Sequence, residues 1–293
     1  MPRTAVLGAG GQLGRELELS LKARGHEVTA LARADLDITD RAALEARLAE
    51  LAPDAVFNAS AYTNVDGAED DRDRALEVNA HAPGHLASLC ARQDIALFHI
   101  STDYVFDGRG PHAEDAPTGP SCVYGETKLM GEQLVLRAHG RALVFRVSWL
   151  FGRFGRNFAK TMLRLGRDRD EVSVVDDQVG SPTPARALAE SLTLALDRVM
   201  EPDFGEYGIY HYSGRPYCSW AGFAQEIFAC AGRGGMLDHE VRVQKIPSSQ
   251  FKTKATRPSD SRLDCSRFER VFGQALPDWH AYIEETLRAA DGK

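Results

Sequence analysis

Short apolar runs alternate with helical patterns through the first half of the chain. Thr4–Leu7 is apolar throughout its last three residues, and Leu13, Leu17 and Leu21 then give the next segment one apolar helical face that ends near Gly25. Further strands are predicted at Val28–Leu31, Ala55–Phe57, Ala96–Ile100 and Leu143–Val147, and further helices at Arg41–Leu51, Asp73–Arg92 and Val123–Arg137. This alternation predicts an α/β fold with a doubly wound parallel sheet.

The regular alternation ends near Trp149. The sequence beyond it is rich in Gly and Arg, and its helical patterns lie at Pro184–Met200 and Trp220–Ala231. We therefore predict a first domain over residues 1–150 and a smaller α/β domain over 151–293. Part of 184–205 is expected to pack back on the first domain, because its helical pattern suits the open face of the sheet.

Composition and charge narrow the classes of partner that the protein is expected to have. The 293 residues carry a formal charge of −7, which makes nucleic acid an unlikely partner because such binding needs many Lys and Arg contacts. The five cysteines are far apart and odd in number, as in reduced cytosolic proteins. The first residues lack the long apolar stretch of a signal peptide, and no segment is apolar enough to cross a membrane. We expect a cytoplasmic protein without a membrane partner.

A glycine-rich loop follows the first strand, with the sequence Gly8-Ala9-Gly10-Gly11-Gln12-Leu13-Gly14. Glycines between a strand and a helix let the backbone turn tightly and bring helix N-terminal amides against a diphosphate. The spacing that fits is Gly8-x-x-Gly11-x-x-Gly14. This pattern predicts a Rossmann-like NAD(P)-binding domain over 1–150, the alternative being a glycine-rich turn without a ligand.

The end of the second predicted strand bears on the choice of cofactor. An acid there would bind the ribose 2′-hydroxyl of NADH, whereas an Arg accommodates the 2′-phosphate of NADPH. The sequence has Ala32 and then Arg33, so NADPH is favoured, although Asp35 could still serve a hydroxyl and allow NADH.

Tyr124 and Lys128 are four residues apart and thus neighbours on one helical face. A nearby ammonium is expected to lower the pKa of the Tyr and suit it to proton transfer. Taken alone, a Tyr and a Lys four residues apart are more typical of an exposed helix surface than of a catalytic pair. Thr102, however, follows the Ala96–Ile100 strand, at the sheet edge where ligands bind, and its hydroxyl could share the carbonyl oxygen that Tyr124 protonates.

These motifs resemble the extended short-chain dehydrogenase/reductases and, among them, the dTDP-4-dehydrorhamnose reductase family. The resemblance covers nearly the whole chain. Its more specific segments are Ser101–Phe106 (STDYVF), Asn157–Leu163 (NFAKTML) and Arg257–Asp264 (RPSDSRLD), and it is also carried by Gly8–Leu17, Leu36–Asp40, Asn58–Asp66, Val123–Glu132, Phe145–Trp149 and Asp177–Thr183.

The resemblance implies a role for each matching residue. It implies that the cofactor diphosphate contacts Gly11, Gln12 and Leu13, that the adenosine contacts Asp37 and Ile38, and that Ala61, Tyr62 and Thr63 lie beside the cofactor. It implies that Thr102, Asp103 and Trp149 contact the sugar substrate and that Thr102, Tyr124 and Lys128 are catalytic. The 151–293 half would then be mainly substrate-binding.

The activity so implied is NADPH-dependent reduction of the C4 keto group of dTDP-4-dehydro-β-L-rhamnose to dTDP-β-L-rhamnose. Two alternatives stay open. One is another sugar-nucleotide 4-keto reductase or an epimerase of the same family. The other is a catalytically idle regulatory subunit, against which the retention of Thr102, Tyr124 and Lys128 argues. The resemblance also leaves open a homodimer, and Mg²⁺ at its contact, which no motif marks.

Three further features have competing interpretations. Basic residues cluster between Arg146 and Arg169 and around Arg257, and some are expected to face the diphosphate of a substrate, although each one alone is more typical of a solvated surface. Trp149 could equally be a core aromatic. His81 and His85 have metal-like spacing without a third ligand, so we assign no metal to them.

Overall fold

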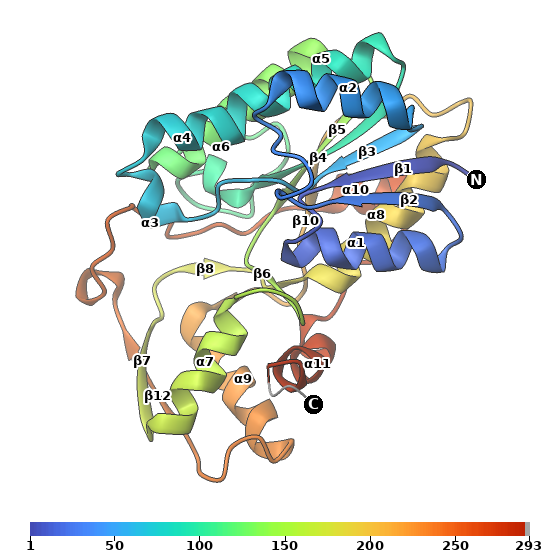
Figure 1. Cartoon of the computed structure of the whole chain (residues 1–293). Helices are drawn as coiled ribbons and strands as arrows, with labels where there is room; N and C mark the ends of the chain where they lie inside the picture. Colours follow the sequence, from blue (N-terminus) through green and yellow to red (C-terminus); the bar gives the residue numbers. More distant parts are fainter. Residues whose placement is uncertain (291–293) are drawn as a thin grey trace.

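The computed structural model describes residues 1–290, so the last three positions of the predicted 151–293 half lie outside it. Its centre is a parallel six-stranded sheet in the order β10-β5-β4-β3-β1-β2 (Figure 1). The strands are β1 Arg3–Leu7, β2 Glu27–Leu31, β3 Ala55–Asn58, β4 Ala96–Thr102, β5 Ala142–Val147 and β10 Gly208–Tyr212. This is the doubly wound, Rossmann-like sheet that the sequence predicts.

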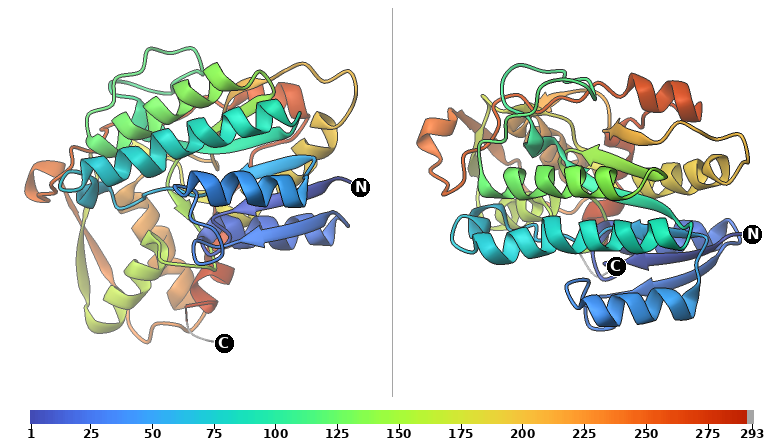
Figure 2. Two further views of the ribbon diagram at one scale, coloured as in Figure 1. Left: turned by 45° about the horizontal axis from the view of Figure 1, so that its top comes forward. Right: turned by 90° about the horizontal axis from the view of Figure 1, so that it is seen from above.

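Helices cover both faces of the sheet (Figures 1 and 2). Alternate strand residues point to opposite faces, so Val6 packs with α1 while Ala5 and Leu7 pack with α2. One face holds α2 Arg41–Leu51, α4 Arg72–Leu76, α5 Ala82–Arg92 and α6 Val123–Ala138, and the other holds α1 Gln12–Ala23, α8 Ala185–Val199 and α10 Ser266–Phe272. Burial on both faces explains why these strands are apolar throughout.

Elements from beyond residue 150 complete this sheet. Leu188, Leu192 and Leu196 of α8 pack in the same core cluster as Leu13 and Leu17 of α1. The sixth strand, β10, pairs with β5 in parallel. Sequence analysis does not predict β10, because its five residues include two tyrosines and a histidine and follow a Gly- and acid-rich turn that resembles a loop.

The remaining elements form a second lobe at one end of the sheet (Figure 1). Its core contains Met162, Leu163, Phe223, Ile227 and Trp279. The helices are α7 Phe158–Asp168, α9 Trp220–Arg233, the 3-10 turn η4 Trp279–Tyr282 and α11 Ile283–Arg288. Short two-stranded ladders join β7 Glu171–Val175 to β12 Arg242–Ile246, β8 Val179–Gly180 to β11 Cys218–Ser219, and β6 Leu150–Phe151 to β9 Thr183–Pro184.

The helix predicted at Asp73–Arg92 is helical along its whole length but not uniform. A π-helical turn, η1 Glu77–His81, separates α4 from α5. Turns of this kind are frequent at functional sites because they redirect one side chain. The redirected chain of interest is Asn79, which is buried and points at the loop after β3.

Candidate active site

A cavity of about 1040 Å³ lies between the two lobes at the carboxyl ends of the strands. The strand order reverses at β1, which is where ligands bind in open α/β sheets. The cavity brings together all the predicted site residues except Gly14: it is lined by Gly8, Gly11, Gln12, Leu13, Arg33, Asp37, Ile38, Ala61, Tyr62, Thr63, Thr102, Asp103, Tyr124, Lys128 and Trp149.

The glycine loop is shaped by close backbone contacts. Gly8 has a φ of +78°, and a Cβ there would lie 2.8 Å from the backbone of Ala59. Gly14 lies outside the cavity lining, and a Cβ on it would lie 2.7 Å from the Cα of Ala9, so it allows α1 to approach the loop. Because Gly11 is the N-cap of α1, the first amides of the helix face an open cradle that fits a cofactor diphosphate.

The end of the cavity near the carboxyl end of β2 contains three charged side chains. Asp37 pairs with Arg74 at 3.2 Å and with Arg33 at 3.4 Å. Hydrogen bonds from the backbone and hydroxyl of Thr39, helped by both guanidinium groups, lower the pKa of Asp37 to about 2. The Arg33 side chain is 78% exposed and free to turn toward a ligand. Sequence analysis missed Arg74, which α4 brings from a distant part of the chain.

The three predicted catalytic residues meet at the centre of the cavity. Thr102 ends β4, Tyr124 lies in the first turn of α6, and Lys128 follows one turn later. Burial raises the pKa of Tyr124, and a hydrogen bond with Thr102 opposes part of this rise.

One expectation about this group is wrong. Burial raises the pKa of Tyr124, and Lys128 does not lower it as expected. The Lys128 ammonium instead donates a hydrogen bond to the Ile100 carbonyl at 2.6 Å. Tyr124 is therefore a neutral phenol, which is the form that gives a proton.

Asp103 is almost completely buried beside these residues. The Thr102 hydroxyl donates a hydrogen bond to its Oδ1 at 3.0 Å and accepts one from the Tyr104 amide at 3.2 Å. Burial raises the pKa of Asp103 to about 7, against the opposing effect of hydrogen bonds from Ser261 and Thr102. Its Oδ2 atom is buried and has no hydrogen-bond partner within the described residues, so the carboxyl group is available to a ligand hydroxyl.

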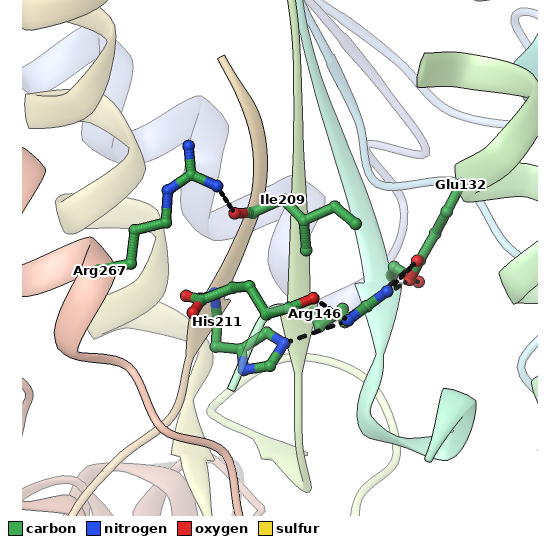
Figure 3. Close-up of polar contacts among 7 residues, drawn as sticks. Glu132, Arg146, Ile209, His211 and Arg267 are labelled. Carbon is green, nitrogen blue, oxygen red and sulfur yellow. Dashed lines mark hydrogen bonds and ion pairs between the residues drawn. The ribbon is translucent and has the colours of Figure 1, made fainter. Parts of the chain in front are cut away.

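A buried ion pair lies beneath Lys128. Arg146 of β5 donates three hydrogen bonds to Glu132 of α6, and its Nη1 lies 3.4 Å from Nε2 of His211 (Figure 3). Arg146 is therefore not available to bind a diphosphate, contrary to what the basic cluster in the sequence suggested. Burial lowers the pKa of Lys128 to about 8, and the negative charge of Glu132 opposes this shift. The same figure shows Arg267 holding the Ile209 carbonyl of β10.

Three of the other basic candidates have partners elsewhere. Arg153 pairs with Glu16 of α1 at 2.7 Å, Lys160 donates to the Arg153 carbonyl at 2.6 Å, and Arg262 pairs with Asp260 at 2.6 Å. Of the clusters that sequence analysis singled out, Arg156 and Arg257 line the cavity.

Arg257 lies in a short network of side chains on the cavity side. It donates to the Tyr104 hydroxyl at 3.0 Å and to Asp66 at 2.9 Å, and the Tyr104 ring meets the Tyr124 ring edge-on at 5.5 Å. Its position ties the segment after β12 to the first domain.

Sequence analysis also missed residues that hold the site from behind. The Asn79 side chain accepts a hydrogen bond from the Tyr62 amide at 2.8 Å and donates to the Tyr62 carbonyl and to Thr127. It thereby fixes the loop after β3 to α6. The available signal was an Asn among apolar positions of a predicted helix. Trp220, which lines the cavity next to Trp149, gave no such signal.

Residues 1–290 contain neither a cluster of metal-binding side chains nor a membrane-spanning helix. This part of the chain holds no group of three or more His, Cys, Asp and Glu side chains arranged to bind a metal. It also has no helix of the length and apolarity that crossing a bilayer requires.

Comparisons with known proteins agree on one family. The family model described as RmlD substrate binding domain matches residues 2–291. A dTDP-4-dehydrorhamnose reductase of Aggregatibacter actinomycetemcomitans is 40% identical over 99% of this chain and 100% of its own. A probable dTDP-4,6-dihydroxy-2-methyloxan-3-one 4-ketoreductase of Streptomyces antibioticus is 40% identical over 97% of this chain and 94% of its own. The crystal structure of a Bacillus anthracis dTDP-4-dehydrorhamnose reductase in complex with NADP is similar, with a TM-score of 0.87, 34% identity, and coverage of 98% of this chain and 99% of that one.

Proposed function

Because the chain belongs to the dTDP-4-dehydrorhamnose reductase family, we propose that it reduces the C4 keto group of dTDP-4-dehydro-β-L-rhamnose with NADPH and gives dTDP-β-L-rhamnose. The observation that carries this proposal is the meeting of Thr102, Tyr124 and Lys128 in the same cavity as the glycine loop. A proton donor and a dinucleotide cradle are the two parts that a carbonyl reduction needs.

NADPH, when bound, supplies the hydride. We assign its diphosphate to the cradle at Gly11, Gln12 and Leu13, and its adenosine to Asp37 and Ile38. Arg33 is the exposed cation for the 2′-phosphate, and this favours NADPH over NADH. Because Arg74 is already paired with Asp37, it keeps that carboxylate from repelling the phosphate.

The proton comes from Tyr124. Its phenol is neutral, because burial raises its pKa, and it gives its proton to the oxygen that becomes the C4 hydroxyl. Thr102 hydrogen-bonds the same oxygen and orients it. Lys128, held by the Ile100 carbonyl, is positioned to bind the nicotinamide ribose.

The substrate is assigned to the second lobe and to the residues that face it. Asp103, with its unpartnered Oδ2, accepts a hydrogen bond from a sugar hydroxyl, and Trp149 contacts the sugar ring. Arg156 and Arg257 are the candidates for the diphosphate, since they are the cluster residues that reach the cavity. In this division the first domain is residues 1–150 with α8, β10 and α10 packed on it. A homodimer, Mg²⁺ at its contact and a cytoplasmic location stay predictions.

The second candidate is reduction of a related dTDP-linked 4-keto sugar. The Streptomyces antibioticus relative, with its different named substrate, is as similar in sequence as the first relative. Residues that contact the sugar decide between the two substrates, and the shared glycine loop and Tyr124–Lys128 pair do not.

One assay tests the proposal. NADPH and NADH oxidation are followed with dTDP-4-dehydro-β-L-rhamnose and with its UDP- and GDP-linked counterparts. We expect turnover with the dTDP sugar and NADPH, with one NADPH consumed per product. An epimerase would convert the sugar without net NADPH loss, and an idle subunit would do neither. Either result would contradict the proposed reduction.

A further inference from the structure

The indole rings of Trp149 and Trp220 are stacked face to face. Their centroids are 3.6 Å apart and their planes differ by 10°. Both residues line the cavity, Trp149 from the segment after β5 and Trp220 from the first turn of α9. Together they form the indole pair, an apolar part of the cavity wall.

Trp149 adopts a backbone conformation that needs support. Its φ is +44°, in the left-handed region that bulky side chains rarely adopt. Its carbonyl accepts a hydrogen bond from the Thr183 amide at 3.1 Å. Its ring lies directly against Gly180, where a Cβ would come within 2.5 Å of Cε2 of the indole. The absence of a side chain at Gly180 therefore makes room for the ring.

Trp220 is fixed to the same place by independent contacts. In the ladder of β8 and β11, Cys218 lies opposite Gly180, and Trp220 follows directly after this ladder. Ser219 caps α9 by accepting a hydrogen bond from the Gly222 amide. The second lobe thus presents a gap bounded by Gly180 and Trp220, and the Trp149 indole occupies it.

We propose that Trp220 is a positioning residue that holds the Trp149 indole in the orientation that receives the sugar of the substrate. This inference rests on the proposed reduction of a dTDP-linked keto sugar. The C–H groups of a deoxyhexose are apolar and pack favourably against the part of an aromatic side chain that lines the cavity, provided that this side chain does not move. Without Trp220 the indole loses its stacking partner, and the backbone at Trp149 loses one of the contacts that hold it.

The stacked indoles supply their own spectroscopic signature. Stacked indoles couple their transition dipoles, and where those dipoles are skewed within the stack they produce an exciton couplet in far-ultraviolet circular dichroism. We expect the couplet in the wild-type protein and its loss in Trp220→Ala, Trp220→Phe and Trp149→Phe. Trp279→Phe is the matched control, because Trp279 is a buried indole of the same lobe that does not line the cavity. That variant should keep the couplet.

The kinetic test separates positioning from simple core packing. In Trp220→Ala we expect KM for dTDP-4-dehydro-β-L-rhamnose to rise roughly 3- to 10-fold, the range of one aromatic pair, while KM for NADPH stays unchanged. Gly180→Ala should raise the same KM by pushing the indole while both tryptophans remain. Trp279→Phe, which removes buried packing and the hydrogen bond to the Pro216 carbonyl away from the cavity, should lower the melting temperature and leave KM unchanged.

Two results would overturn the inference: a wild-type spectrum without the couplet, or an unchanged sugar KM in a variant that has lost it. If Trp220→Ala does not fold, Trp220→Phe fills most of the space and decides by the same two readouts. A wild-type protein that does not turn over the sugar nucleotide contradicts the proposed function instead. Titration of the couplet with dTDP then still decides whether the indole pair faces a ligand: a changed couplet supports that placement, and an unchanged one overturns it.

Discussion

Arg146 and Glu132 form a two-pronged ion pair in the interior of the protein, with Nη2 of Arg146 2.7 Å from Oε2 of Glu132 and both side chains at most 3% exposed. Glu132 also accepts a hydrogen bond from Ser101, the residue before Thr102. Because Glu132 lies one helical turn after Lys128, the pair joins β4, β5 and α6 directly behind the reacting groups. This arrangement sets the first prediction.

Replacing one partner of this ion pair should lower the free energy of unfolding strongly, whereas replacing both partners should lower it little. Arg146→Met leaves an uncompensated buried carboxylate, so we expect the free energy of unfolding to fall by about 3–5 kcal/mol. The double variant Glu132→Gln, Arg146→Met should recover most of that loss. Chemical denaturation measures both. Arg92→Met, which breaks an exposed pair with Glu45, is the control and should cost less than about 1 kcal/mol.

Tyr124→Phe should remove the proton donor and little else. We expect kcat to fall by about 10²- to 10⁴-fold, with the dissociation constant of NADPH unchanged, because the phenol acts on the substrate oxygen. Stopped-flow NADPH oxidation and fluorescence titration measure the two quantities. Tyr207→Phe is a control, since its hydroxyl bonds Arg141 away from the cavity. Wild-type turnover in Tyr124→Phe would contradict the assigned mechanism.

Arg33→Ala should change the preference between the two cofactors. Loss of an exposed cation beside the 2′-phosphate is expected to raise KM for NADPH roughly 3- to 10-fold and to leave KM for NADH unchanged. Steady-state kinetics with each cofactor measures the ratio. Arg41→Ala removes an exposed Arg that does not line the cavity and should alter neither value. Equal increases for both cofactors would show that Arg33 does not read the phosphate.

Asp103→Asn should make stability less sensitive to pH between about 4 and 7. Burial raises the pKa of Asp103 from 3.8 to about 7, so its favourable contribution is complete below pH 3.8 and is lost as pH rises through about 7. Asn mimics the protonated carboxyl. We expect the melting temperature of the wild type to fall relative to Asp103→Asn across this window.

Asp37→Asn is a control for which we expect the opposite dependence of stability on pH. The pKa of Asp37 is lowered to about 2, so its contribution is present above pH 3.8 and lost only as pH falls through about 2. Removing the charge should therefore destabilise the protein at neutral pH. A wild-type melting temperature that runs parallel to that of Asp103→Asn at every pH would show that Asp103 does not titrate in this window.

Local sequence patterns predicted many of the residues that line the cavity. Gly8, Gly11 and Gly14 stand at positions where a side chain would strike neighbouring backbone, and Thr102 follows an apolar strand, so their placement follows from spacing along the chain. The row of apolar strands also fixed the parallel sheet. By contrast, Arg146 has the charge expected of a ligand-binding residue, and its partner Glu132 lies on a different element. Nothing in either local sequence shows that the two will meet.

The sequence by itself determined the strand–helix alternation, the glycine loop and the Tyr124–Lys128 pair, because these depend on periodicity and on neighbours within one or two turns. Only the tertiary structure decided which side chains face one another across elements. In the folded protein Arg146 is buried against Glu132, and Arg74 pairs with Asp37. Lys128 donates a hydrogen bond to the Ile100 carbonyl, and Trp220 stacks on Trp149. Burial and distance set both ion pairing and pKa, and neither quantity exists until the chain is folded.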